Sequence, residues 1–362
     1  MIPIADPELG AEERERVMAV IDSGQIAGGP EVAAFESEFA DYCDAEYAVA
    51  TTNGTTALHA ALVACGIGPG DTVLTTPFSF VATANTIRLA GAEPVFAEID
   101  PETYNLDPDA AEAVLEERGD VDAIMPVHLY GLPAAMDRFV ELAEEHDAAL
   151  IEDAAQAHGA EIDGEHVGAI GDAGCFSFYP TKNMTTGEGG MVTTDDEEIE
   201  ARLREFVNHG REPGAGYAHA SVGHNFRLTD MAAAIGRIQL ERLPGFNERR
   251  RENARTLTEK LGESVVTPIE PEGYRHVYHQ YTVRTEDREA LIERLDDRGV
   301  GYGIYYPSCI HQYEAYDGYD VRTPVAERAA DEVLSLPVHP NLTEEGIDGV
   351  ISAVADREVS RV

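Results

Sequence analysis

The sequence predicts an α/β protein: a large domain with a mostly parallel sheet covered by helices, followed by a smaller C-terminal α/β domain. Short runs rich in β-branched and aromatic residues alternate with helical runs through the first half of the chain. Helices between such strands give parallel pairing with right-handed crossovers, which covers the sheet on both faces. The chain has 362 residues, 43% of them apolar, and exceeds the length at which a single core usually stops growing. Two domains are therefore expected.

The strands of the large domain are predicted from β-rich runs, most of them followed by a helical run. Helices are expected at 55–65, at 79–91 and in the segment that ends at His146. The strand runs are YAVAT (47–51), DTVLTT (71–76), EPVFAEI (93–99), DAIMPVHLYG (122–131), AALIEDA (148–154), GCFSFYP (174–180) and GGMVTT (189–194). Ligands of such sheets bind at the carboxyl ends of the strands, so the residues that follow these runs are candidates for a site.

The boundary between the domains is predicted near residue 245, which gives a large domain at 1–245 and a small one at 246–362. After a charged helix near Asp195, the segment 229–243 forms a helix that opens on capping residues and should stop before Pro244. The smaller domain is expected to contain a charged helix at about 246–262, the runs YRHVYHQYTVRT and LIERLDDRGVGYGIYY, and a last helix at 344–357.

The formal net charge of −42 comes from 68 acidic residues spread along the whole chain, which indicates a solvated surface and not a disordered acidic tail. This composition, with lysine nearly absent, resembles that of proteins from salt-loving organisms, where dissolved ions screen the repulsion between carboxylates. The same charge disfavours nucleic-acid binding. Mimicry of a nucleic acid would instead gather the charge on one face.

Export and membrane insertion are not indicated, because no apolar stretch approaches the roughly 20 residues of a membrane span and no leader pattern is present. The cysteines, at positions 43, 65, 175 and 309, are far apart and have no histidine at ligand spacing. Neither a disulfide framework nor a metal site is therefore expected. We expect a protein of the reducing cytoplasm.

Lysine is rare: 24 of the 26 basic residues are Arg, and the two lysines are Lys182 and Lys260. Lys182 lies in FSFYPTKNMTTGEGGMVTT (176–194). An amine can become neutral, attack a carbonyl and shuttle protons, whereas a guanidinium stays charged at any working pH. A chain that prefers Arg for charge would keep Lys182 if this nitrogen reacts, while Lys260, in a charged helix, fits an ordinary surface lysine.

Further candidates lie at the ends of other predicted strands. Gly54 and Thr55 turn the chain into a helix, which suits a phosphate. Phe80 brings an aromatic ring to a strand end, and Asp153 brings a partly desolvated carboxylate. Taken singly, these residues have plainer explanations: a helix cap, a core aromatic and an N-cap. Ser177 lies five residues before the lysine.

A phosphate cradle, a stacking ring, an acid for a ring nitrogen and a reactive amine are what pyridoxal phosphate requires. With these residues in place, the sequence resembles the DegT-type nucleotide-sugar aminotransferases, which are fold type I pyridoxal-phosphate enzymes. The resemblance covers essentially the whole chain. It is carried by GGPEVAAFESEFADY, NGTTAL, TPFSFVATANTI, IEDAAQAHGA, FSFYPTKNMTTGEGGMV, GHNFRLTDMAAAIGRIQL, YYPSCIHQ and LSLPVHPNLTEEGID.

The resemblance implies a role for each matching residue. Lys182 would hold the cofactor covalently, and Asp153 would pair with the pyridine nitrogen. Phe80 would stack on the ring, and Gln156 would lie near its phenolic oxygen. The phosphate would be bound by Gly54, Thr55 and Ser177, joined by Asn225 from a partner subunit. The weaker candidates for the substrate side are Arg227, Tyr305, Tyr306 and His311.

The sequence departs from the family pattern at two visible positions. Asn53 stands where the family often has Ser, and Cys309 stands where its substrate loop often has Pro. The second departure bears on the shape of the loop and so on the choice of sugar.

The implied activity is transfer of an amino group from L-glutamate to a keto-sugar held by a nucleotide diphosphate, by a homodimer with shared active sites. One alternative is a sugar dehydratase of the same family, in which the lysine position is histidine. The other is a non-catalytic regulatory relative, in which the lysine or the aspartate should be lost. Lys182 and Asp153 are both present.

Overall fold

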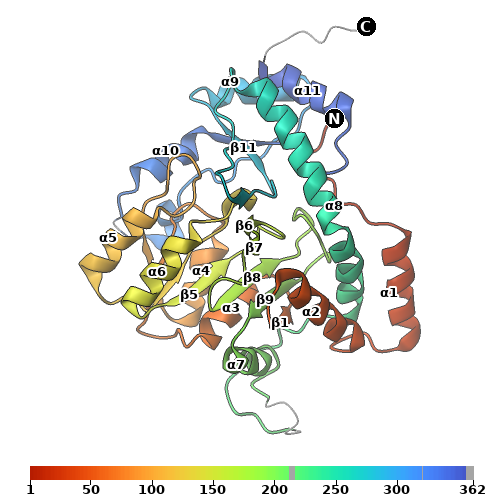
Figure 1. Ribbon diagram of the computed structural model, residues 1–362, viewed down its shortest axis with the longest axis vertical. Helices are drawn as coiled ribbons and strands as arrows, with labels where there is room; N and C mark the ends of the chain where they lie inside the picture. The colour runs from red at the N-terminus through yellow and green to blue at the C-terminus, as the bar shows by residue number, and fades with distance from the viewer. Residues whose placement is uncertain (212–216, 320, 356–362) are drawn as a thin grey trace.

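The centre of the molecule is a seven-stranded sheet with the order β1-β9-β8-β5-β4-β2-β3 (Figure 1). The structure, a computed structural model, describes residues 1–211, 217–319 and 321–355. The strands of this sheet are β1 (Tyr47–Thr51), β2 (Thr72–Thr75), β3 (Glu93–Phe96), β4 (Ala123–Met125), β5 (Ala149–Asp153), β8 (Ala173–Ser177) and β9 (Gly190–Thr194). Each of the predicted strand runs in the first half of the chain overlaps one of them.

The sheet is mostly parallel, as predicted, but β9 runs antiparallel to both of its neighbours, β8 and β1. The segment between β8 and β9 contains no helix, so these two strands pair without the crossover that parallel pairing needs. Because β9 reverses the direction twice, β1 runs the same way as β8. The carboxyl ends of β1, β2, β5 and β8 therefore meet at one edge of the sheet.

Helices cover both faces of the sheet, and the inward side chains of each strand alternate between the two cores. On β5, for example, Ile151 packs on one face and Leu150 on the other. The first face is covered by α3 (Gly54–Ala64), α4 (Ala82–Ala90) and α7 (Glu197–Val207). The second face is covered by α2 (Pro30–Cys43), α5 (Pro108–Arg118), α6 (Met136–His146) and α8 (Asp230–Leu261).

The long helix α8 corrects the sequence analysis, because it continues through Pro244 instead of stopping before it. Proline inside a helix removes one hydrogen bond and costs about 3 kcal/mol. Contacts on both sides of the proline hold the helix together: Arg237 pairs with Glu31 of α2 at 2.9 Å, and the Asn247 amide donates to the carbonyl of His158 at 2.8 Å. The domain boundary near 245, which falls inside α8, stays a prediction.

Beyond the middle of α8 the chain builds a separate core of its own (Figure 1). α1 (Ala11–Ser23) packs against α8 as well, with Arg242 bonded to Glu12 and Glu13. The remaining elements are β6 (Glu161–Ile162), β7 (Glu165–His166), β10 (Tyr274–Arg275), β11 (Tyr281–Arg284), α9 (Arg288–Asp297), α10 (Pro324–Glu332), β12 (Val333–Leu336) and α11 (Glu344–Ala355). The last helix was predicted to reach residue 357, and residues 356–357 lie outside the described part of the chain.

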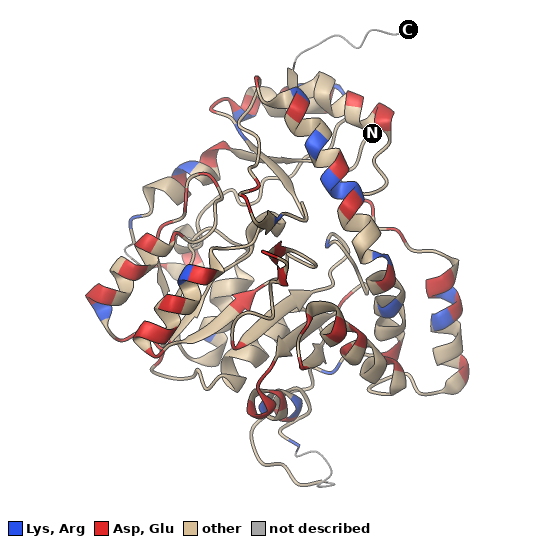
Figure 2. Cartoon of the chain, viewed as in Figure 1, with Lys and Arg blue, Asp and Glu red and all other residues tan. Residues whose placement is uncertain are grey.

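Acidic residues are distributed over helices throughout the chain, interspersed with fewer basic ones (Figure 2). No helix in the described residues has both the length and the apolar character to cross a membrane. Within the same residues no group of His, Cys, Asp and Glu side chains gathers as a metal site, and the four cysteines are free thiols.

Candidate active site

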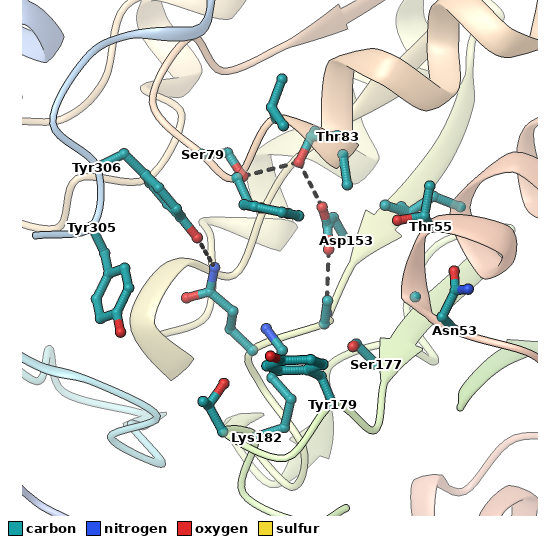
Figure 3. A pocket seen from close by; sticks show the side chains of 18 of the residues that line it. Asn53, Thr55, Ser79, Thr83, Asp153, Ser177, Tyr179, Lys182, Tyr305 and Tyr306 are labelled. Atoms are coloured by element: carbon teal, nitrogen blue, oxygen red, sulfur yellow. Dashed lines mark hydrogen bonds between the residues drawn. The ribbon is translucent and has the colours of Figure 1, made fainter. Parts of the chain in front are cut away.

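A cavity of about 1240 Å³ lies at the sheet edge where β1, β2, β5 and β8 end. It is large enough for a cofactor and a second ligand together. The structure brings into this cavity most residues predicted for the cofactor and two of those predicted for the substrate (Figure 3). They are Gly54, Thr55, Phe80, Asp153, Gln156, Ser177, Lys182, Tyr305 and Tyr306.

The first turn of α3 forms one wall, and Asn53 caps it. The Asn53 side chain accepts the N–H of Thr56 at 2.9 Å, and the Asn53 N–H donates to the Thr56 hydroxyl at 3.1 Å. Asn53 thus does the capping work that a serine could do. A Cβ placed on Gly54 would lie 2.7 Å from Cβ of Ser177, so only glycine lets the helix start approach β8 this closely. A helix N-terminus and a hydroxyl therefore face each other across a small space.

Asp153 is the last residue of β5 and is buried. Its carboxylate accepts the Thr83 hydroxyl at 2.8 Å and the Ala155 N–H at 3.2 Å (Figure 3). Burial raises the pKa of Asp153, and these two hydrogen bonds and the charge of Lys182 oppose that rise. An acid held in this balance can share a proton with a basic partner.

Lys182 follows β8 in a loop that is held in place by hydrogen bonds. Its N–H donates to the carbonyl of Tyr179 at 2.9 Å, and the side chain of the next residue, Asn183, donates to Asn247 of α8 at 2.8 Å. Burial lowers the pKa of the Lys182 amine to about 8, although the negative charge of Asp153 opposes the shift. The amine can therefore lose its proton near physiological pH.

Gln156 is held by two hydrogen bonds. Its Oε1 accepts the N–H of Tyr130 at 2.9 Å, and its Nε2 donates to the hydroxyl of Tyr306 at 3.2 Å. The Phe80 side chain is 55% exposed, with its ring centroid 6.1 Å from that of Tyr306. Phe80 is thus not the core aromatic of the plainer explanation, since its ring is open to a ligand.

The loop after Tyr306 is fixed by the unexpected Cys309. The N–H of Cys309 donates to Oε1 of Gln312 at 3.0 Å, a bond that proline in this position could not make. The next N–H, that of Ile310, donates to the carbonyl of Pro77 at 2.7 Å. This loop is therefore attached to the segment that carries Phe80.

Three predicted residues do not line the cavity of one chain. Asn225 is exposed, and Arg227 donates to the side chain of Asn208 at 2.6 Å. His311 lies with Nε2 3.5 Å from a carboxylate oxygen of Glu327. Within one chain the structure does not join these side chains to Lys182.

Comparison with known proteins decides what this cavity belongs to. Residues 7–355 match the DegT/DnrJ/EryC1/StrS aminotransferase family. The chain belongs to this family. It is a sugar aminotransferase that uses pyridoxal phosphate.

Individual members of the DegT/DnrJ/EryC1/StrS family resemble the chain along its length. A pleiotropic regulatory protein of Geobacillus stearothermophilus is 41% identical, with 98% of both chains covered. A UDP-N-acetyl-3-dehydro-alpha-D-glucosamine 3-aminotransferase of Acidithiobacillus ferrooxidans is also 41% identical, over 92% of this chain and 90% of that one. The crystal structure of a family aminotransferase from Brucella abortus superimposes with a TM-score of 0.92 at 36% identity and covers 95% of each chain.

The residues present in this aminotransferase fit its cofactor. The close approach of Gly54 to Ser177 makes a cradle that a side chain would fill, at the positive end of α3. Three further groups line the same cavity: the buried amine of Lys182, a carboxylate at the end of β5 and an exposed aromatic ring. These are a phosphate site, a reactive amine, an acid and a stacking surface.

Several residues of the cavity were not predicted from the sequence, among them Ser79, Thr83, Tyr179 and His279. Ser79 and Thr83 were visible in principle, because they lie four residues apart in a run predicted to be helical, and that spacing places two side chains on one helix face. In the structure Ser79 lies just before α4. Tyr179 and His279 gave no comparable signal, since no spacing connects them with the other cavity residues.

Proposed function

We propose that this family member takes the amino group of L-glutamate and transfers it to a keto-sugar carried by a nucleotide diphosphate, as a step toward amino-sugar and glycan precursors. The observation that carries the proposal is the pair Lys182 and Asp153, a buried amine and a buried acid in one cavity. The family and the name of the Acidithiobacillus relative support a nucleotide-linked sugar as the acceptor.

Lys182 is the proposed anchor of the cofactor and the proposed base. Bound pyridoxal phosphate supplies an electron sink for the charge left on a carbon that loses its proton. The neutral Nζ of Lys182 accepts the proton from Cα of the amino acid and later returns it. Because the pKa of the amine is about 8, both its protonated and its neutral forms are accessible at working pH.

Asp153 is the proposed partner of the pyridine nitrogen, where its carboxylate holds a proton on the ring. Phe80 offers its open face to the ring, and Gln156, fixed by Tyr130, orients an amide near the phenolic oxygen. Fixed groups of this kind lose little freedom when they bind.

The phosphate is proposed to lie at the start of α3. In the described chain the N–H groups of Gly54 and Thr55 have no acceptor, because the Asn53 cap uses only the Thr56 N–H. These two N–H groups and the hydroxyl of Ser177 can each donate to a phosphate oxygen.

We propose a homodimer, because the cavity of one chain has too little positive charge for its ligands. Among its lining residues only Lys182 is a cation, whereas Asp153 and Glu188 are acidic. A cofactor phosphate and a nucleotide diphosphate bring several negative charges. Arginines or amides of a second copy could supply the missing donors.

The segment 224–227 fits this role. The N–H groups of His224 and Phe226 donate to the carbonyls of the last two residues of α7, at 2.7 and 3.0 Å. The rings of His224 and Phe226 stack with their centroids 4.6 Å apart. The Arg227 side chain lies against Asn208, the residue that follows α7, whereas the Asn225 side chain is exposed. The exposed amide of Asn225 is therefore the first candidate to reach a partner's site.

On the substrate side we propose Tyr305, Tyr306 and His311, together with Arg227 of a second copy. The two tyrosines line the same cavity as Lys182 (Figure 3). Gln156 occupies a lone pair of the Tyr306 hydroxyl, which leaves its proton free for a ligand oxygen.

Neither alternative has a supporting observation at the site. A dehydratase should carry histidine where Lys182 stands. A purely regulatory role, suggested by the name of the Geobacillus relative, should tolerate loss of Lys182 or Asp153, and both are present. We also propose that the protein works in the salt-rich cytoplasm of a salt-adapted organism, on the ground of its charge of −42.

The test is a half-reaction. L-glutamate should convert the loaded enzyme to its amino form, and a panel of nucleotide-linked 3-keto and 4-keto sugars is then offered to that form. One class of sugar should restore the aldehyde absorbance and appear as the amino sugar by mass spectrometry. If 2-oxoglutarate restores the absorbance and no sugar does, the proposed acceptor is wrong.

A further inference from the structure

A line of three buried side chains leads from the turn that precedes α4 to the acid at the end of β5. The hydroxyls of Ser79 and Thr83 lie 2.9 Å apart, and the Thr83 hydroxyl lies 2.8 Å from Oδ2 of Asp153 (Figure 3). Ser79 is 2% exposed, Thr83 is fully buried and Asp153 is 4% exposed. Water has little access to these contacts, so their energies are not diluted by solvent.

The direction of the protons follows from counting donors. A hydroxyl has one proton, and Thr83 gives its proton to the carboxylate, which has none to give while it is ionised. Ser79 must then donate to the oxygen of Thr83. The chain of donation therefore runs from Ser79 through Thr83 to Asp153, and each donor strengthens the next.

We propose that Thr83, supported by Ser79, is a positioning residue that keeps Asp153 ionised, so that the shared proton stays on the cofactor ring nitrogen. The proposal rests on the pairing of Asp153 with that nitrogen proposed above. The Asp153 carboxylate and the ring nitrogen compete for one proton. The proton stays on the nitrogen to a greater extent when the carboxylate is less basic.

Burial works against this task, and the Thr83 hydroxyl offsets it. Burial raises the pKa of Asp153, and the Thr83 hydrogen bond is the strongest of the interactions that lower it. The second oxygen of Asp153 accepts the N–H of Ala155 at 3.2 Å, a longer contact. Removing the hydroxyl therefore removes the main support of the ionised form.

The backbone places this hydroxyl with little freedom. The Thr83 N–H donates to the carbonyl of Phe80 at 3.1 Å, so the turn that fixes Thr83 also carries the ring proposed to stack on the cofactor. Thr86, on the same helix, is equally buried, but its hydroxyl donates to the carbonyl of Thr83 at 3.0 Å and does not contact Asp153. Thr86 offers a matched control.

The experiment reads the ring nitrogen directly, with enzyme loaded with ¹⁵N-labelled pyridoxal phosphate and its nitrogen chemical shift measured by NMR. Thr83→Val should move the shift toward the unprotonated value and lower kcat about tenfold or more, with KM little changed. Thr83→Ser should restore both values, Ser79→Ala should give a smaller change in the same direction, and Thr86→Val should leave both at the wild-type level.

Asp153→Asn separates this inference from the function on which it rests. If Asp153→Asn leaves the nitrogen shift at the wild-type value, the pairing of Asp153 with the nitrogen is wrong, and this inference with it. If Asp153→Asn moves the shift and folded Thr83→Val does not, only the role of Thr83 is overturned. Should Thr83→Val fail to fold, an unchanged shift in folded Ser79→Ala overturns the inference.

Discussion

At the scale of single residues, the proposed chemistry depends on Lys182, one of two lysines in a chain whose other basic residues are 24 arginines. The structure adds a physical reason for the choice. Burial lowers the pKa of the Lys182 amine to about 8, which a guanidinium could not match, because it stays protonated at any pH an enzyme meets. A lysine retained for charge alone would have no reason to be buried.

The first prediction is therefore a titration. In cofactor-free protein, labelling of Lys182 by an amine-reactive reagent should rise with a midpoint near pH 8, because only the neutral amine reacts. Peptide mass spectrometry across a pH series gives the midpoint. Since the charge of Asp153 raises this pKa, Asp153→Asn should move the midpoint lower; a midpoint above pH 10 in the wild type would contradict the buried amine.

The second prediction concerns Asp153 in the working enzyme. Asp153→Asn should fold and bind cofactor, but transamination should fall by roughly 10²-fold or more, because an amide cannot hold the pyridinium charged. Circular dichroism checks that the variant folds and binds the cofactor, and steady-state turnover measures the fall in transamination. Near-normal turnover would show that Asp153 is only a structural residue at the end of β5.

Lys182 and Asp153 could be predicted from the sequence, because lysine is rare in this chain and both residues follow predicted strands. The residues that hold the site residues by hydrogen bonds could not be predicted. The Thr83 hydroxyl meets Asp153 across 70 residues of chain, and Tyr130 holds Gln156 through a backbone N–H. Hydroxyls and N–H groups are too common for sequence spacing to show which of them meet.

At the scale of elements, the strands were predicted well and the long helix was not. Strand runs here are buried and apolar, so their pattern is strong in the sequence. Pro244 signals the end of a helix locally, and only tertiary contacts on both sides of it make α8 continuous. The antiparallel β9 could be anticipated only by noticing that no helix precedes it.

The third prediction belongs to the segment 224–227 and the shared site. Lys182→Ala and Asn225→Asp should each be inactive alone, and co-refolding the two should restore activity. A hybrid dimer then has one site with both lesions and one with neither, if Asn225 serves the partner's site. Activity is assayed after the hybrids have been separated by a charge tag.

Within one chain, Asn225 does not line the cavity. If Asn225 nevertheless served the site of its own chain, each site of a hybrid dimer would carry one lesion and stay inactive. Absence of recovery in proven hybrids would remove the shared site and leave the aminotransferase assignment unchanged. A mixture of Lys182→Ala with Lys182→Met is the control, since no combination of these gives an intact site.

At the scale of the whole molecule, the dominant feature is 68 acidic against 26 basic residues, distributed along the whole chain (Figure 2). Some of the arginines are engaged in ion pairs, such as Arg237 with Glu31 and Arg16 with Glu31. In the part of the chain that the structure describes, most carboxylates lack such a partner, because 26 basic residues are too few for 68 acidic ones. Under the proposed salt adaptation, dissolved salt screens the repulsion between them.

The fourth prediction follows from this imbalance: the thermal midpoint should rise with potassium chloride, and activity should rise with it. Calorimetry over a series of salt concentrations measures the first part. An uncharged osmolyte such as sucrose, matched in water activity, separates screening from exclusion effects. A midpoint that is flat or falls with added chloride would contradict the proposed salt adaptation.

The central claim is that Lys182 holds the cofactor, and borohydride reduction tests it most directly. Reduction of the loaded enzyme should fix a pyridoxyl phosphate group on the peptide that contains Lys182, found by digestion and mass spectrometry. Lys182→Arg, reduced in the same way, should carry no label. A label on Lys260, or no label on fully loaded wild-type protein, would contradict the claim.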